Sequence, residues 1–183
     1  MPTAMVPLAD GVEEMEAVII IDVLRRAEWE IVSVGLKSGP VTASRGVVLV
    51  PDKVWHEVDP ATFDWLILPG GLPGTQRMIA DQRVLQALQT HARAEKKIGA
   101  ICAAPTVLHA AGLLRGQAIT SHPSVAERLG DTRRSNDRVV IDGNYITSQG
   151  PGTAFEFALA LVTAENGSAK ADELAQSMIC AKN

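Results

Sequence analysis

The chain has few cysteines and little excess charge. Its 183 residues include only two cysteines, Cys102 and Cys180, which are too few for a disulfide framework. The net charge of −4 provides no basic surface of the kind that binds nucleic acid or an anionic membrane. We therefore expect a reduced, cytoplasmic protein with no nucleic-acid partner.

Long apolar runs are also missing. The longest hydrophobic stretch is interrupted by Asp22, so no membrane span is predicted. The N-terminus lacks a basic region followed by an apolar stretch, and a secretory signal is not expected. The chain is 46% hydrophobic and 21% charged, as in ordinary globular proteins. Its length predicts a single domain over residues 1–183.

Short apolar runs alternate with longer segments of helical period, a pattern typical of an α/β fold with helices on both faces of a mostly parallel sheet. The expected strands are Ala4–Leu8, Glu30–Gly35, Asp64–Leu68, Lys97–Ile101, Ala118–Thr120 and Tyr145–Ser148. The expected helices are Val12–Arg26, Thr75–Glu95, Ala104–Ala111, Pro123–Leu129, Ala154–Glu165 and Ala169–Ile179. Segments 41–50 and 137–148 have the pattern of antiparallel ribbons. Pro7 cannot donate to a ladder and predicts an irregularity in the first strand.

Several chemically interesting residues directly follow predicted strands. Sites in open α/β sheets form beyond the carboxyl ends of the strands. The segments that follow strands in this way are Asp10-Gly11, Pro69-Gly70-Gly71, Cys102 and Ser121-His122-Pro123. We expect these four segments to converge on one edge of the sheet.

Cys102 is the strongest of these signals. It ends the strand predicted over Lys97–Ile101, and the small residues Ala103-Ala104 with Pro105 then start a helix. A side chain at such a corner stands above the sheet, as in a nucleophile elbow. The positive field of a helix N-terminus favours the reactive thiolate. A buried core cysteine is the alternative, and this run alone does not decide between them.

Glu16 is the second signal. Its neighbours one helical turn away are Val12, Ile19 and Ile20, so its carboxyl lies on an apolar face. Burial there would raise its pKa and favour the protonated form, which can shuttle a proton. Alternatively, Glu16 is a further acid at a helix N-terminus that reaches water.

Other candidates are weaker. His122 is held at the same sheet edge by Pro123 and is the best candidate base, but no acid is found to orient its ring. His56 and His91 lie in polar stretches and are expected to be solvated.

The glycine pair and an arginine offer binding groups. Gly70 and Gly71 leave N–H groups that could face a negative oxygen, although the loop also reads as a simple turn. The loop lacks the spacing of a P-loop or a dinucleotide site. Arg45 stands in a turn, where it could contact an anion or be solvated.

Together the motifs resemble the ThiJ/PfpI superfamily, in the branch that includes the DJ-one and YajL proteins. The motifs, in family order, are Gly11-x-Glu13-Glu14-x-Glu16, Leu68-Pro69-Gly70-Gly71, Ala100-Ile101-Cys102-Ala103-Ala104-Pro105, Thr120-x-His122-Pro123 and Gly150-Pro151-Gly152-Thr153. Four residues, at three places in the chain, depart from the pattern. Leu72-Pro73 replaces a more polar pair, Glu28 stands where the family often has glycine, and Pro7 is unusual in the first strand.

The resemblance implies a flavodoxin-like three-layer sandwich that forms a homodimer, with one cysteine site per subunit and no cofactor or metal. The residues that it implicates are Cys102 as oxidation-sensitive nucleophile, Glu16 as its protonated partner, His122 as the nearby histidine, Gly71 and Ala103 as backbone donors, and Arg26 and Arg45 as arginines lining the pocket near the dimer interface.

The function implied is that of a glyoxalase or deglycase acting on methylglyoxal, glyoxal and their early adducts through the cysteine. A redox sensor or chaperone that uses oxidation of Cys102 to the sulfinate is the alternative. Cysteine peptidase or amidotransferase activity is less favoured, because those chemistries usually need an acid to orient the histidine.

Overall fold

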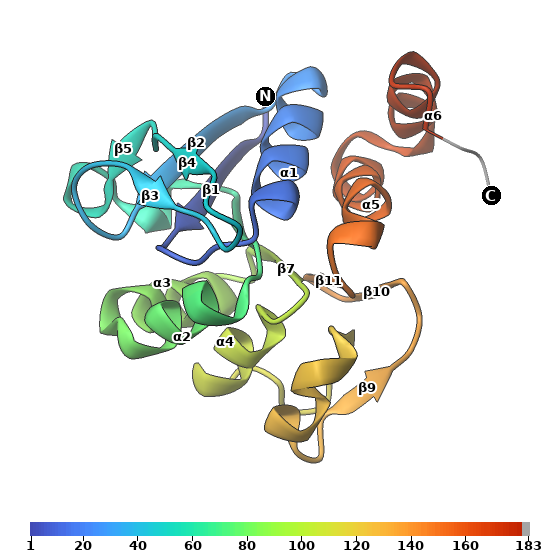
Figure 1. Ribbon diagram of the computed structural model, residues 1–183. Helices are drawn as coiled ribbons and strands as arrows, with labels where there is room; N and C mark the ends of the chain where they lie inside the picture. The colour runs from blue at the N-terminus through green and yellow to red at the C-terminus, as the bar shows by residue number, and fades with distance from the viewer. Residues whose placement is uncertain (181–183) are drawn as a thin grey trace.

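The computed structural model describes residues 1–180, which are built around a seven-stranded sheet (Figure 1). The strand order is β10-β11-β7-β6-β1-β2-β5. The strands are β1 (Thr3–Leu8), β2 (Glu30–Gly35), β5 (Lys53–Val54), β6 (Trp65–Leu68), β7 (Lys97–Ile101), β10 (Val139–Asp142) and β11 (Tyr145–Ser148). Neighbouring strands are parallel except β10 and β11, which form the antiparallel ribbon predicted from the sequence. The predicted flavodoxin-like fold is confirmed.

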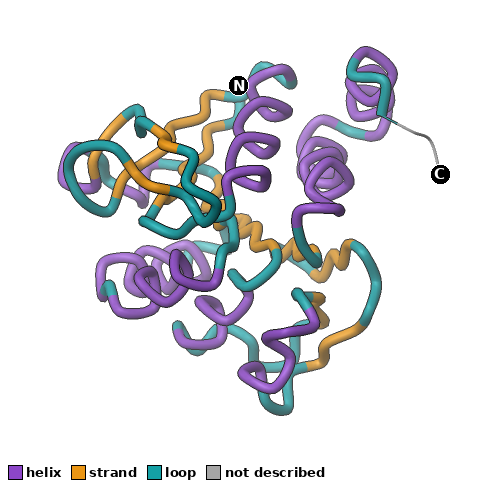
Figure 2. Tube along the Cα trace, in the orientation of Figure 1, coloured by secondary structure: helices purple, strands orange, loops and turns teal. Residues whose placement is uncertain are grey.

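Helices cover both faces of this sheet, and Figure 2 shows the strands passing between the two groups. The α-helices are α1 (Glu14–Arg26), α2 (Leu72–Ala80), α3 (Gln82–Arg93), α4 (Pro105–Ala110), α5 (Ala154–Asn166) and α6 (Ser168–Ser177). Helices α1, α5 and α6 cover one face, and α2, α3 and α4 cover the other. Among residues 1–180, no helix combines the length and apolar character needed to cross a bilayer.

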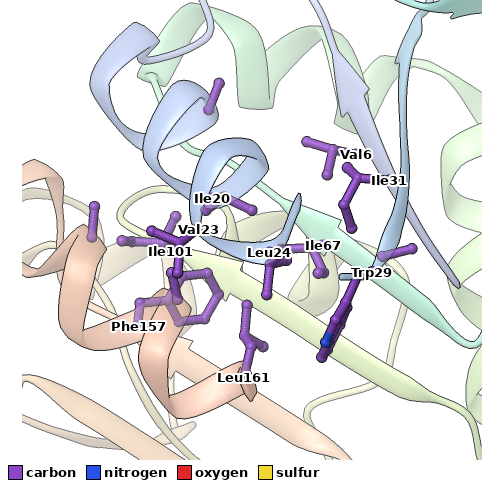
Figure 3. Close-up of a cluster of buried hydrophobic side chains, with 14 of the residues drawn as sticks. Val6, Ile20, Val23, Leu24, Trp29, Ile31, Ile67, Ile101, Phe157 and Leu161 are labelled. Atoms are coloured by element: carbon purple, nitrogen blue, oxygen red, sulfur yellow. The ribbon is translucent and has the colours of Figure 1, made fainter. Parts of the chain in front are cut away.

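The central strands are apolar on both sides, which explains their continuous hydrophobic runs. In β6, Trp65 and Ile67 pack toward α1 and α5, whereas Leu66 and Leu68 pack toward α3 and α4. Figure 3 shows the first of these two cores, where Phe157 of α5 meets side chains of α1 and the sheet. The sheet therefore holds α1 and α4 in fixed positions at the carboxyl ends of β1 and β7.

Smaller elements complete the chain. They are β3 (Val41–Thr42), β4 (Val48–Leu49), β8 (Ala118–Thr120), β9 (Arg133–Ser135) and the 3-10 helices η1 (Trp55–Glu57), η2 (Pro60–Thr62), η3 (Pro123–Leu129) and η4 (Pro151–Thr153). The antiparallel pair of β3 and β4 confirms the ribbon predicted over 41–50. Strand β8 pairs with β9 outside the main sheet, and the helix predicted over Pro123–Leu129 is a 3-10 helix.

Two local expectations differ from the structure. The helix predicted over Thr75–Glu95 is divided at Asp81, whose carboxylate accepts the N–H of Arg83 at 3.0 Å and caps α3. Strand β1 is regular through Pro7, because its pairing with β6 extends only to Met5 and the proline lies beyond it. Glu28 adopts φ of 65°, the left-handed conformation that favours glycine.

Candidate active site

Cys102 occupies a sharp turn between β7 and α4. Its φ is 64°, a conformation that costs energy in a residue with a side chain and is held here by neighbouring segments. Its N–H donates to the carbonyl of Ser148 at 2.9 Å, and its own carbonyl accepts the N–H of His122 at 2.9 Å. The carboxyl end of β11 and the segment after β8 therefore fix the turn that the sequence predicted.

Glu16 lies in the first turn of α1 and is completely buried. Its Oε2 atom accepts the N–H of Gly70 at 2.7 Å, and its Oε1 atom has no hydrogen-bond partner within residues 1–180. Burial raises the pKa of Glu16 to about 7, although the Gly70 N–H and the Cys102 thiol oppose the rise. The predicted burial on an apolar face is confirmed, and the carboxyl retains its proton below neutral pH.

The Cys102 thiol is a weaker acid than the sequence suggested. Burial, followed by the negative charge of Glu16, raises its pKa to about 12, whereas the N–H groups of Gly71 and Ala103 lower it. The predicted stabilisation by the helix N-terminus is insufficient, since α4 has only six residues and the thiol is largely desolvated. A charge on either acid opposes ionisation of the other. Ionisation of the thiol is therefore least opposed while Glu16 holds the proton.

Gly70 brings these two acids together. A Cβ at this position would lie 2.6 Å from Cys102 Cβ and 2.7 Å from Glu16 Oε2, so no larger residue fits without movement. Its N–H is already bound by Glu16 and is not free to donate to a substrate oxygen. The expectation that Gly70 offers an oxyanion donor is thus wrong. The N–H groups that interact with the sulfur belong to Gly71 and Ala103.

His122 is oriented by Ser124 rather than by an acid. Its Nδ1 atom lies 2.7 Å from Ser124 Oγ and accepts the Ser124 N–H at 3.2 Å. A nitrogen that accepts from a backbone N–H carries no proton, so the neutral ring has its proton on Nε2. The ring is thereby prepared to donate from Nε2. Ser124 was not predicted from the sequence, where the available signal is a hydroxyl two residues after the histidine.

Cys102, His122 and the segments around them surround a cavity of about 290 Å³. Its lining consists of Glu13, Ser44, Arg45, Gly71, Leu72, Pro73, Cys102, Ala103, His122, Ser124 and Pro151. Five of the predicted site residues are therefore brought to one cavity from separate parts of the chain. Glu16 and Gly70 are not part of the lining, and the carboxyl of Glu16 is buried behind Cys102 and Gly70.

Arg26 is not brought to this cavity. It lies in the last turn of α1, whereas Glu16 lies in the first, and its Nε atom pairs with Asp22 Oδ2 at 2.7 Å. The side chain is about half exposed. Within a single subunit, the predicted role of Arg26 in lining the pocket is therefore not supported, and Arg45 is the arginine found there.

A polar cluster sets the charge of one side of the cavity. Ser44 Oγ lies 2.7 Å from Glu13 Oε2 and 2.8 Å from Glu14 Oε2, and the Arg45 N–H donates to Glu14 Oε1 at 2.9 Å. Burial opposes ionisation of Glu14, but backbone N–H groups and the Ser44 hydroxyl hold its pKa below the usual value. Glu14 thus ties the loop that carries Arg45 to the start of α1. Within residues 1–180, no three His, Cys, Asp or Glu side chains are grouped to hold a metal ion.

The fold and the cavity define a flavodoxin-like α/β protein with a cysteine on a strand-to-helix elbow and a buried carboxyl behind it. The sequence profile of the DJ-1/PfpI family matches residues 2–164, and the chain belongs to this family.

Relatives match along nearly the whole chain. Protein dj-1beta of Drosophila melanogaster is 42% identical over 184 residues, covering 99% of this chain and 98% of its own. Protein DJ-1 homolog B of Arabidopsis thaliana is 43% identical over 180 residues, and the match covers 97% of this chain but 41% of the plant protein. This chain thus spans less than half the length of the plant relatives it matches. The solved structure of oxidized DJ-1 of Toxoplasma gondii superimposes with a TM-score of 0.95 at 36% identity, over 100% of both chains.

One relative is named for an activity. Glutathione-independent glyoxalase DJR-1.2 of Caenorhabditis elegans is 37% identical over 175 residues, which cover 94% of this chain and 93% of that protein.

Proposed function

We propose that the protein is a cofactor-free glyoxalase or deglycase that acts on methylglyoxal, glyoxal and their early adducts. The observation that carries this proposal is the buried Glu16 behind Cys102, which can hold a proton near neutral pH. The relative named as a glutathione-independent glyoxalase supports the same chemistry.

The first step joins the substrate to the enzyme. The sulfur of Cys102 attacks the aldehyde carbon of methylglyoxal to give a hemithioacetal, and a proton reaches the former carbonyl oxygen from the thiol through Glu16. The N–H groups of Gly71 and Ala103 stabilise the oxygen while it carries negative charge. His122 donates a hydrogen bond from Nε2 to a substrate oxygen in the cavity.

The second step moves a proton between the two carbons. The Glu16 carboxylate removes the proton from the carbon bonded to sulfur, giving an enediolate, and returns that proton to the adjacent carbon. The hydroxyl proton on the carbon bonded to sulfur moves to the neighbouring oxygen, which leaves a thioester carbonyl next to the sulfur. The resulting lactyl thioester is hydrolysed by water, which releases lactate and restores the thiol. Arg45 provides a cation in the cavity for the carboxylate product.

The test is lactate formation from methylglyoxal without glutathione, by the wild type, Cys102→Ser, Glu16→Gln and the control Cys180→Ser. We expect turnover by the wild type and Cys180→Ser, with losses of about 1000-fold in Cys102→Ser and about 100-fold in Glu16→Gln. Full activity in Cys102→Ser, or none in freshly reduced wild type, would contradict the proposal.

A redox sensor or chaperone remains the second candidate, because the same geometry suits an oxidised sulfur. A protonated Glu16 and the two N–H groups would hold a sulfinate on Cys102. Mild peroxide followed by peptide mass analysis tests this function. Cys102 should gain two oxygens before Cys180 does, and preferential oxidation of Cys180 would count against it.

We also propose that the protein is a cytoplasmic homodimer. Apolar side chains are exposed on α1, where Met15 is 54% and Val18 is 49% exposed. Arg26 lies on the same helix, and it would line the cavity of a second subunit only if that subunit packed against α1. Light scattering after size exclusion should give twice the 19.5 kDa chain mass, and Val18→Glu should shift it toward the monomer.

A further inference from the structure

One part of the cavity lining is apolar and exposed, although most large apolar side chains of the protein are buried. Leu72 is the first residue of α2 and is 40% exposed. It lines the cavity together with Pro73 and Pro151, alongside the charged cluster of Glu13 and Arg45. The cavity thus offers a surface on which an apolar group can be buried.

The backbone holds Leu72 in place. Gly71, which precedes it, has φ of 88°, and a Cβ there would lie 2.3 Å from the Gly11 carbonyl. The Gly74 N–H donates to that carbonyl at 3.2 Å, and the Thr75 hydroxyl donates to the carbonyl of Leu72 at 3.0 Å. Because the start of α2 is fixed against the loop before α1, contact with Leu72 requires little ordering of the protein.

The cavity has room for more than a very small substrate. Its volume of about 290 Å³ corresponds to roughly nine or ten water molecules at about 30 Å³ each. Methylglyoxal attached to Cys102 would fill only part of this space. A longer substituent could extend from the reacting carbons to the apolar lining.

We infer that Leu72, supported by Pro73 and Pro151, is a specificity-determining residue that favours 2-oxoaldehydes carrying an alkyl chain longer than methyl. This inference rests on the proposed glyoxalase chemistry. The substituent does not react, and the products are the corresponding 2-hydroxy acids. The chain gains binding energy as it leaves water, whereas glyoxal has no substituent to bury.

A homologous series tests the inference. With glyoxal, methylglyoxal and 2-oxohexanal, we expect kcat/KM of the wild type to rise about two- to fourfold per added methylene. In Leu72→Asn the rise should fall below about 1.5-fold per methylene, while Leu72→Met retains it. Ile141→Asn, at a residue 56% exposed on β10, is the control and should behave as wild type. A wild type without chain-length preference, or an unchanged preference in Leu72→Asn, would overturn the inference.

A second measurement does not depend on turnover. Alkylation of Cys102 by iodoacetamide and by N-butyl iodoacetamide forms one S–C bond, expels iodide and releases the thiol proton to solvent. Peptide mass analysis, with Cys102→Ser as the blank, gives the rate at this residue. For each protein we take the ratio of the rate with N-butyl iodoacetamide to the rate with iodoacetamide. This ratio should be several-fold higher in the wild type than in Leu72→Asn. If no 2-oxoaldehyde is turned over, the proposed function fails and this ratio alone decides the role of Leu72: an equal ratio in both proteins overturns it.

Discussion

Within residues 1–180, two regions bury an ionisable side chain completely. Glu16 lies behind the cavity, and His91 lies near the end of α3, on the other face of the sheet. Glu16 accepts a backbone N–H and adjoins a thiol, whereas neither ring nitrogen of His91 has a hydrogen-bond partner within residues 1–180. Burial of a titratable group therefore does not by itself mark a functional site. The site is distinguished by the separate chain segments that converge on Cys102.

Burial favours the neutral form of both side chains, but with opposite consequences for pH dependence. Burial raises the pKa of Glu16 to about 7 and lowers the pKa of His91, to which Lys96 also contributes. The carbonyls of Ala87 and Phe63 lie near the ring and oppose the lowering of the His91 pKa, although neither forms a hydrogen bond with it. The folded state therefore loses stability as pH rises and Glu16 ionises, and it loses stability as pH falls and His91 becomes protonated.

Among the substitutions that test this comparison, the largest effect is expected from crowding the contact of Gly70 with Glu16 and Cys102. In Gly70→Ala the added methyl would lie 2.6 Å from Cys102 Cβ and would displace the cysteine. Because the sulfur would then be misplaced, kcat/KM of the variant should fall about 100-fold. Crowding should also cost about 1–3 kcal/mol of unfolding free energy. Lactate assays, Cys102 alkylation rates and urea denaturation measure these effects.

Gly152→Ala is the matched control for this test. A Cβ at Gly152 would meet no atom within 4 Å, so activity and stability should stay close to those of the wild type. If Gly70→Ala were alkylated and turned over substrate as the control does, the close approach of Gly70 to Cys102 and Glu16 would have no functional importance.

The next effect concerns the pH dependence of stability. The folded pKa of Glu16 is about 7 and its usual value is 4.5, so the folded state binds the proton more tightly. The resulting contribution to the unfolding free energy is fully present below the usual pKa of 4.5 and is lost as pH rises through 7. The change is about 2–3 kcal/mol between pH 5 and 8. Glu16→Gln keeps the shape of the side chain and cannot ionise. The difference in unfolding free energy between wild type and variant, measured in urea, should follow this curve; a constant difference would show that Glu16 is not buried as a neutral acid.

A smaller effect is expected at His122, the partnered counterpart of His91. In Ser124→Ala the hydroxyl 2.7 Å from Nδ1 is lost, but the backbone N–H still reaches that atom. The ring should keep its tautomer and lose some of its orientation, lowering kcat about three- to tenfold with little change in KM. Ser124→Thr should restore most of the activity. An equal loss in both variants would point to a steric role for this position instead.

Cys102 and Glu16 could be chosen as candidates from the sequence because their signals are local, although neither signal alone decided between a functional and a structural role. Cys102 directly follows a predicted strand and precedes a predicted helix, and Glu16 lies one helical turn from apolar residues. The alternating apolar strands and longer helical segments likewise predict the layered fold. The role of Gly70, the position of Arg26 and the orientation of His122 depend on which groups meet after folding. The acidity of the thiol was misjudged for the same reason, since it depends on the depth of burial and on the charge of Glu16.

His91 gives the smallest effect and the sharpest contrast with Glu16. The sequence around it is polar, and the expectation that it is solvated is wrong: its side chain is fully buried between α3 and the sheet. Because burial lowers its pKa below the usual 6.5, the unfolded chain binds the proton more tightly, and stability is lost as pH falls below that value.

His91→Leu, which removes the titration from a similar volume, should flatten the acid side of the stability curve, while His56→Leu at an exposed histidine should leave it unchanged. The dicarbonyl activity should be unaffected in both variants. Urea denaturation at pH 5 to 7 provides the measurement. A loss of activity in His91→Leu would show that the two buried groups communicate across the sheet. The contrast between Glu16, in the proposed active site, and a purely structural His91 would then no longer hold.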